Sequence, residues 1–155
     1  MTCKTLSLPT RGQVYVIYVR SAMLHASECW PIKSEDLSRL QRNERAMLRW
    51  MLNFRVQDHT SCSHMYNMLQ IPTLESILTT HRLHWYGHTE RSNRWINKIR
   101  HLEVDGYTGR GRPQKRWYDV VSADIKKWKL NDQDPLDRTK WRGHLQQIMA
   151  KSNPS

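Results

Sequence analysis

Apolar residues along most of this chain recur at helical spacing, most clearly over residues 34–52. There the apolar positions lie three or four residues apart: Leu37, Leu40, Met47, Leu48 and Met51. This spacing predicts the buried face of an amphipathic helix. Ser34 is a candidate N-cap, and Glu35 and Asp36 fall in the first turn, where the helix dipole favours anions. The opposite face carries arginines at the same spacing: Arg39, Arg42, Arg45 and Arg49.

Three further segments before residue 92 fit helices. Residues 12–26 are dense in apolar side chains; the β-branched run of residues 14–19 also suits a short strand, but the uninterrupted continuation to Leu24 favours a helix that Pro31 ends. A shorter helix is expected over 61–69, burying Met65, Met68 and Leu69. Thr73 is expected to cap a third, reaching about Glu90. Its apolar positions are Leu74, Ile77, Leu78, His81 and Trp85, and Gly87 is expected to fray or kink its end.

The remaining pattern predicts helices separated by turns. A short one is expected over 92–99, followed by a turn at Asp105–Gly106. Pro113 suits the first turn of the next helix, and Asp134–Pro135 reads as the N-cap and first residue of the last. Their apolar positions are Trp117, Val120, Val121, Ile125 and Trp128, then Trp141, Leu145, Ile148 and Met149. Loops are expected at 53–60 and 103–112.

The predicted fold is therefore all-α: a small irregular bundle of about five to six helices, or two loosely packed lobes. We divide the chain into an unstructured start (1–11), a first helical segment (12–70), a basic Trp-rich helical segment (71–150) and a tail (151–155). Tryptophans are expected to anchor a thin core, because each buries a large apolar area. These structural anchors are Trp30, Trp50, Trp85, Trp117, Trp128 and Trp141.

The net charge of the chain indicates which class of partner it binds. The formal net charge is +11, which favours a polyanion, with nucleic acid first and an anionic membrane surface second. Three widely spaced cysteines argue against a disulfide framework and for a reducing compartment. No apolar run approaches the ~20 residues of a membrane span, and no signal peptide is evident. We expect an intracellular location, nuclear or cytoplasmic, without a membrane partner.

Cations and tryptophans concentrate between residues 81 and 117. Nine Lys/Arg face three acids there, interleaved with Trp85, Trp95 and Trp117. Cations beside flat aromatic faces suit phosphate neutralisation and base stacking. The alternative is a solvated basic face over core tryptophans. The sequence of residues 110–113, Arg-Gly-Arg-Pro, matches the core of the AT-hook, which inserts arginines into the minor groove of A·T-rich DNA.

Other chemistry finds little support. His81, His84 and His88 share a predicted helix face, but further ligands at zinc spacing are missing, so packed or surface histidines are favoured and no metal or cofactor is expected. The carboxylates are scattered, and no phosphate loop, nucleophile elbow or paired aspartates occur. We therefore expect no enzymatic activity.

Three blocks of sequence resemble a known family. They are residues 14–30, with Ser-Ala-Met-Leu and Ser-Glu-Cys-Trp; residues 36–50, with Met-Leu-Arg-Trp at the end; and residues 82–91, Arg-Leu-His-Trp-Tyr-Gly-His-Thr-Glu-Arg. Gly111-Arg112-Pro113 and Trp117 follow. In this order the blocks are similar to the segment after the polymerase core in non-LTR retrotransposon reverse transcriptases. His84 departs from the family, which often has arginine there.

The resemblance implies thumb and post-polymerase helices that hold a primer–template or the element's RNA, without the catalytic aspartates. It also implies a polymerase domain of a longer product as a partner. The leading hypothesis is a non-catalytic, nucleic-acid-binding helical remnant. The expected phosphate contacts are Arg42, Arg45, Arg49, Arg82, Arg91, Arg110, Arg112, Lys115 and Arg116. The alternatives are a structural fragment without independent function and an A·T-rich minor-groove binder using Arg110 and Arg112.

Overall fold

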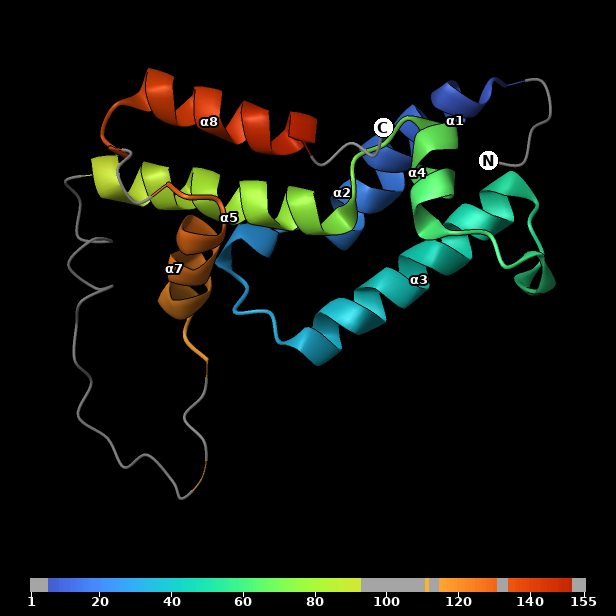
Figure 1. Cartoon of the computed structure of the whole chain (residues 1–155), viewed down its shortest axis with the longest axis horizontal. Coiled ribbons are helices and arrows are strands. Elements are labelled where there is room, and N and C mark those ends of the chain that lie inside the picture. Colours follow the sequence, from blue (N-terminus) through green and yellow to red (C-terminus); the bar gives the residue numbers. More distant parts are fainter. Residues whose placement is uncertain (1–5, 93–110, 112–114, 131–133, 152–155) are drawn as a thin grey trace.

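The computed structural model describes residues 6–92, 111, 115–130 and 134–151. These residues form helices and no strand, which confirms the all-α prediction. The helices of the first half lie at one end of the molecule and those of the second half at the other, with α5 reaching between them (Figure 1). The predicted helix at 92–99, the loop at 103–112, Arg110 and Arg112 lie outside the described residues.

The first helical rod begins earlier than the sequence predicts. It comprises α1 (Leu8–Val14), the π-helical segment η1 (Tyr15–Arg20) and α2 (Ser21–Met23). Ser7 sets its start, because its hydroxyl accepts a hydrogen bond from the Thr10 N–H at 3.3 Å. Residues 8–11 are therefore helical, and the predicted unstructured start of 1–11 is too long. The rod ends at Met23, well before Pro31, with Ala26 in the left-handed region.

The second long helix matches its prediction closely. A 3₁₀ turn, η2 (Ser27–Cys29), leads to α3 (Ser34–Leu52), whose five predicted core positions are all buried or half-buried. Lys33 rather than Ser34 is the N-cap residue, and Asn53 ends the helix in the left-handed region. After the short turn η3 (Val56–Asp58), α4 (Cys62–Leu69) begins behind Ser61, whose hydroxyl accepts from the His64 N–H at 3.2 Å.

The second half is built around α5 (Leu74–Arg91), which Thr73 caps as predicted. Helix α8 (Arg138–Lys151) lies antiparallel beside α5, and α7 (Trp117–Lys127) packs against α5 from below (Figure 1). The predicted core residues Trp141, Leu145 and Ile148 are all buried there. Two starts differ from prediction. Helix α7 begins at Trp117 behind its cap Arg116, four residues after the predicted start at 113, and Asp137 replaces Asp134 as the cap of α8.

Asp137 takes the capping role because its carboxylate reaches three donors of the first turn. Its Oδ1 accepts from the Thr139 hydroxyl at 2.6 Å and from the backbone N–H groups of Thr139 and Lys140, both at 3.1 Å. These hydrogen bonds, that from the Thr139 hydroxyl foremost, lower the pKa of Asp137 to about 2. Asp134 instead accepts from the Leu136 N–H at 2.8 Å in the preceding turn.

Gly87 was expected to fray or kink the end of α5, but in the structure it allows α8 to pack closely against α5. A Cβ atom at this position would lie 2.5 Å from Nε1 and 2.7 Å from Cδ1 of Trp141. The Trp141 ring is itself fixed, since its Nε1 donates to the Leu83 carbonyl at 3.0 Å. The missing side chain lets α8 approach α5 closely, and α5 continues as a helix to Arg91.

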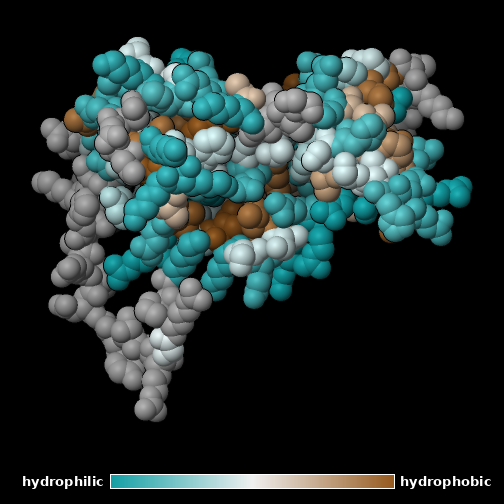
Figure 2. Space-filling view, in the orientation of Figure 1, coloured by the Kyte–Doolittle hydropathy of each residue, from teal (hydrophilic) through white to brown (hydrophobic). Residues whose placement is uncertain are grey.

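Three apolar clusters hold the helices together. The first lies among the rod, α3 and α4 (Tyr15, Leu48, Met51, Met65, Leu69 and Ile71), and the second among α5, α7 and α8 (Leu83, Val121, Leu130, Trp141, Leu145 and Ile148). The third joins the two halves through Leu24, Leu74, Ile77 and Leu78. Figure 2 shows apolar side chains gathered beneath α5, between α7 and α3, on an otherwise largely hydrophilic face. No helix among the described ranges is long and apolar enough to cross a membrane.

Candidate nucleic-acid interface

The outer face of α3 carries a row of cations without acidic partners. Arg42 and Arg45 are exposed and Arg49 is half-buried. Within the described part of the chain, none of the three forms an ion pair. Arg42 bonds only within its helix, where its Nε donates to the Ser38 carbonyl at 3.4 Å. Their guanidinium groups are therefore available to phosphate oxygens.

This row stays positive because the acid in its midst turns inward. Glu44 lies between Arg42 and Arg45 in sequence, but its side chain is fully buried and forms an ion pair with Arg20 of the first rod. The remaining acids of α3, Glu35 and Asp36, lie in its first turn. The charged side chains in the middle and at the end of the outer face are thus all arginines.

Glu44 organises a buried polar centre. Its Oε1 accepts from Arg20 Nε at 2.9 Å and from the Tyr15 hydroxyl at 3.2 Å, while its Oε2 accepts from the Tyr66 hydroxyl at 2.6 Å. Arg20 also donates to the Pro72 carbonyl at 2.8 Å. Burial, reinforced by Glu44, raises the pKa of both tyrosines, so their hydroxyls remain donors. This centre ties the rod to α3 and α4 and fixes which face of α3 points outward.

A groove opens at the amino-terminal half of α3. Its cavity volume is about 530 Å³ and its walls come from the segment before α3 and from α3 itself: Trp30, Pro31, Ile32, Lys33, Asp36, Arg39, Leu40 and Asn43. A shallower hollow of about 300 Å³ beside it is lined by Arg39 and Arg42, among others. The groove combines an aromatic wall with exposed Lys33 and Arg39 at the start of the arginine row. We call the groove and the row together the α3 surface.

Arg82 is not part of any exposed basic surface, which corrects the prediction. Its side chain is only 8% exposed, and Nε and Nη2 donate to Oδ2 of Asp124 at 2.8 and 2.7 Å. Nη2 also donates to the Thr79 hydroxyl at 3.4 Å. The ion pair joins α5 to α7. A phosphate could reach Arg82 only by breaking it.

The other predicted cations are scattered. Arg91 is half-buried, and its Nη1 donates to the Pro135 carbonyl at 2.7 Å, where it holds the turn before α8. Lys115 and Arg116 are exposed just before α7. The α3 surface and these two residues belong to different halves of the molecule (Figure 1). The structure therefore groups Arg42, Arg45 and Arg49 and separates the remainder from them.

The tryptophans divide into anchors and surface rings. Trp141 is buried, and Trp117 is half-buried with its Nε1 donating to the Glu28 carbonyl at 2.6 Å. Trp30, Trp85 and Trp128 are half-buried too. Trp50 is 59% exposed, so its prediction as a structural anchor is wrong. The reason is its place on α3, opposite the stripe of Leu48 and Met51 that faces the core.

The histidines do not converge on a metal. Among the described ranges, no group of three His, Cys, Asp or Glu side chains is placed to hold an ion. His81 forms a hydrogen bond between its Nδ1 and the Ser27 hydroxyl at 2.9 Å, and burial lowers its pKa. His88 stacks on Trp85 with ring centroids 5.3 Å apart.

The sequence-based site set missed Trp30 as a groove wall and omitted Lys33, Arg39 and Asn43. The sequence did contain a signal for Arg39, because this residue continues the arginine spacing of residues 42–49 toward the amino terminus, on the same helix face. The groove itself depends on how residues 30–33 pass over α3, which no local pattern encodes.

Comparison with protein-family models, with curated proteins and with solved structures yields no significant match for this chain.

Proposed function

We propose that this chain is a non-catalytic, nucleic-acid-binding helical module that contacts phosphates through the α3 surface. The observation that carries the proposal is the row of exposed, unpaired guanidinium groups at Arg39, Arg42 and Arg45. The net charge of +11 supports it, because the surplus of cations favours a polyanion. The resemblance of three sequence blocks to non-LTR retrotransposon reverse transcriptases supports the same function and suggests its origin.

The α3 surface suits sequence-independent binding. Guanidinium groups bind phosphate oxygens strongly but carry no base information themselves. Arginines spaced three or four residues apart on a straight helix can follow a phosphate backbone. The basic run at residues 110–116 adds further cations and favours a nuclear location within the same proposal.

The test is a salt titration of the purified chain on single-stranded RNA and on duplex DNA, after a cooperative thermal melt has shown that the protein is folded. We expect log K to fall linearly with log salt, by roughly 0.7 to 0.9 for each phosphate neutralised. Affinity that stays constant from low to moderate salt contradicts the proposal.

One observation favours the structural alternative. Ile17 and Tyr18 on the first rod are 61% and 70% exposed, as expected of a helix that another polypeptide covers. In that case the isolated chain should bind a hydrophobic dye or melt without cooperativity. Ile17→Gln together with Tyr18→Gln should then abolish dye binding, whereas a nucleic-acid module should retain its salt-dependent affinity in this variant.

A further inference from the structure

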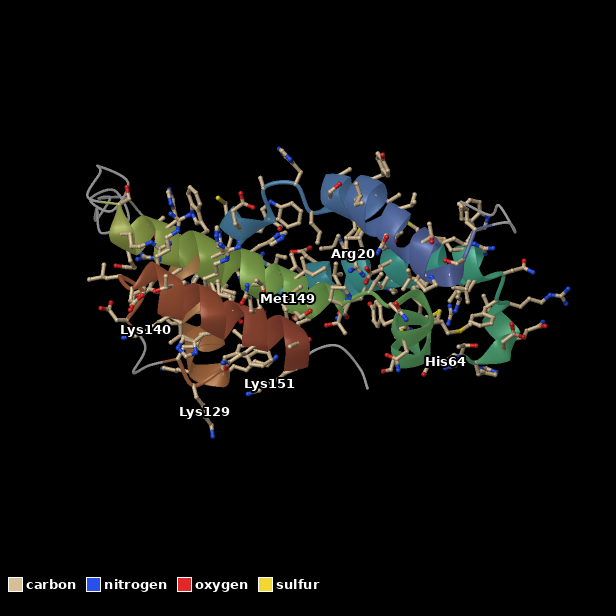
Figure 3. The ribbon with its side chains drawn as sticks, turned by 90° about the horizontal axis from the view of Figure 1, so that it is seen from above. Arg20, His64, Lys129, Lys140, Met149 and Lys151 are labelled. Atoms are coloured by element: carbon tan, nitrogen blue, oxygen red, sulfur yellow. The ribbon has the colours of Figure 1, made fainter. Side chains whose placement is uncertain are left out.

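A second cavity, apart from the α3 surface, lies between α5 and α8. Its volume is about 530 Å³, and its walls come from η2, α5 and α8: Glu28, Thr80, His81, His84, Trp85, Arg142, Leu145, Gln146 and Met149. Figure 3, seen from above, shows Met149 where α8 faces α5 and Lys140 on the opposite side of α8. Two of its α5 residues correct the sequence-based prediction, because His81 and Trp85 line this cavity and are absent from the apolar clusters.

The cavity offers a flat aromatic wall over an apolar floor. Leu145 is buried and Met149 half-buried, so this part of the lining is apolar. The half-buried Trp85 ring stands at the wall, and His88 stacks against it at 5.3 Å with an interplanar angle of 30°. An indole ring at the side of a cavity is a suitable platform for a planar heteroaromatic ring.

One polar group that lines the cavity, the Thr80 hydroxyl, has no hydrogen-bond partner among the described residues. The Thr80 hydroxyl oxygen is buried and forms no hydrogen bond, a costly arrangement for a group able to donate and to accept. The Ser27 hydroxyl is hydrogen-bonded to Nδ1 of His81, and burial lowers the pKa of this imidazole. An imidazole, a hydroxyl and the Gln146 amide match the mixed donors and acceptors on the edge of a nucleobase.

Helix α8 brings cationic side chains to one side of the cavity. Arg142 lines it, and Arg138 lies one turn earlier on the same face of α8 and is exposed. Among the described residues that line the cavity, Glu28 is the one acid. A phosphate attached to a ring held on Trp85 would therefore meet a guanidinium group at the rim.

We propose that this cavity holds one unpaired nucleobase of a single-stranded nucleic acid, stacked on Trp85, with its polar edge at Thr80 and its phosphate at Arg142. The inference rests on the proposed function, because the base arrives as part of a bound strand. A duplex cannot occupy the cavity, since its bases are paired and stacked. The cavity thus predicts a preference for single strands, which the arginine row does not provide.

The test compares three ligands by fluorescence anisotropy: a single-stranded oligonucleotide, its duplex, and a single strand of equal length with abasic sugars. Wild-type chain should bind the base-containing single strand most tightly. Thr80→Val keeps the side-chain shape and should weaken that binding about fivefold, as for one lost hydrogen bond. Trp85→Leu should weaken it roughly tenfold or more. Neither change should alter binding to the duplex or to the abasic strand.

Matched controls isolate the cavity from charge and from folding. Trp50→Leu removes an exposed tryptophan of α3, and Lys140→Gln removes a cation on the far side of α8, whereas Arg142→Gln removes one at the rim. Only Arg142→Gln should reduce the preference for the base-containing strand. Thr80→Val should melt no lower than wild type, because the hydroxyl it removes has no partner.

The outcomes separate the two proposals. Equal wild-type affinity for abasic and base-containing strands overturns the cavity assignment and leaves the α3 surface standing. So does an equal effect of Thr80→Val and Trp85→Leu on all three ligands. A free nucleoside monophosphate that binds the cavity while strand binding stays base-independent also overturns it. Failure to bind any of the polymers overturns both proposals.

Discussion

Helices α3 and α5 are nearly equal in length, at 19 and 18 residues, and both carry arginines, but they use them in opposite ways. On α3 an acid, Glu44, points into the core and meets an arginine of another helix, so the outer arginines stay free. On α5 an arginine, Arg82, points inward and meets Asp124. On each helix, the charged residue that turns inward forms the buried ion pair. The arginines of a helix therefore form a basic surface when an acid, and not an arginine, occupies the inward position.

The two buried ion pairs should show the largest effects on stability. Arg20→Met leaves the Glu44 carboxylate buried without its counter-ion, and we expect a loss of about 3–5 kcal/mol in the free energy of unfolding. Arg82→Met should cost less, about 3 kcal/mol, because Asp124 retains 13% exposure and can be reached by water. Chemical denaturation of both variants measures the difference.

A double substitution checks that the loss comes from the orphaned charge. Arg82→Met with Asp124→Leu replaces the pair by apolar side chains of similar size, which should restore most of the stability. If the double variant is as unstable as Arg82→Met alone, the ion pair is not what joins α5 to α7.

Alanine substitutions at Gly87 of α5 and Gly143 of α8 should change the free energy of unfolding in opposite directions. Gly87→Ala places a Cβ atom 2.5 Å from Trp141 Nε1, so we expect a loss of about 1–3 kcal/mol from overpacking. A Cβ atom at Gly143 of α8 would meet no other group within 4 Å, and Gly143→Ala should stabilise the chain by about 0.5–1 kcal/mol through helix propensity. Thermal melts that move in the same direction for both variants contradict the close contact between α5 and α8.

His81 should add a smaller, pH-dependent effect. Burial lowers its pKa in the folded state below the ordinary value of 6.5, so the unfolded chain binds the proton more readily. Its contribution to stability is therefore fully present above about pH 6.5 and is lost as the pH falls below that value. Glu28 opposes the shift and His84 reinforces it. His81→Gln should flatten the pH dependence of the melting temperature between pH 5 and 7.

Local patterns in the sequence predicted the helices well. Over residues 34–91, apolar spacing and the Thr73 cap place α3, α4 and α5 to within one or two residues. The cap of α8 was misplaced because Asp134 and Asp137 are both reasonable N-caps, and only the geometry of the turn at Pro135 chooses between them.

The site was harder to predict because it depends on distant partners. Arg82 is buried because it pairs with Asp124, 42 residues away. The arginines of the α3 surface lack an acidic partner because Glu44 pairs with Arg20, 24 residues away. Neither pairing leaves a local signal. Trp50 is a different case, because the helical spacing of Leu48 and Met51 already places it away from the core, whereas residue type alone suggested a buried anchor. The proposed uses of Arg110 and Arg112 remain predictions.

Substitutions of the arginines on the α3 surface should change the stability of the chain least and its affinity for nucleic acid most. Arg42→Gln, Arg45→Gln and Arg49→Gln together remove three cations that form no described ion pair, so stability should change by less than about 0.5 kcal/mol per substitution. The matched control replaces Lys129, Lys140 and Lys151 with Gln, which removes the same charge from the second half of the molecule (Figure 3).

The salt dependence of binding by these two triple variants tests the central claim most directly. If α3 contacts the phosphates, the α3 variant should lose about 2 to 3 from the slope of log K against log salt, while the control keeps the wild-type slope. Equal slopes for the two variants would contradict the account, because binding would then follow total charge and not the arginine row of α3.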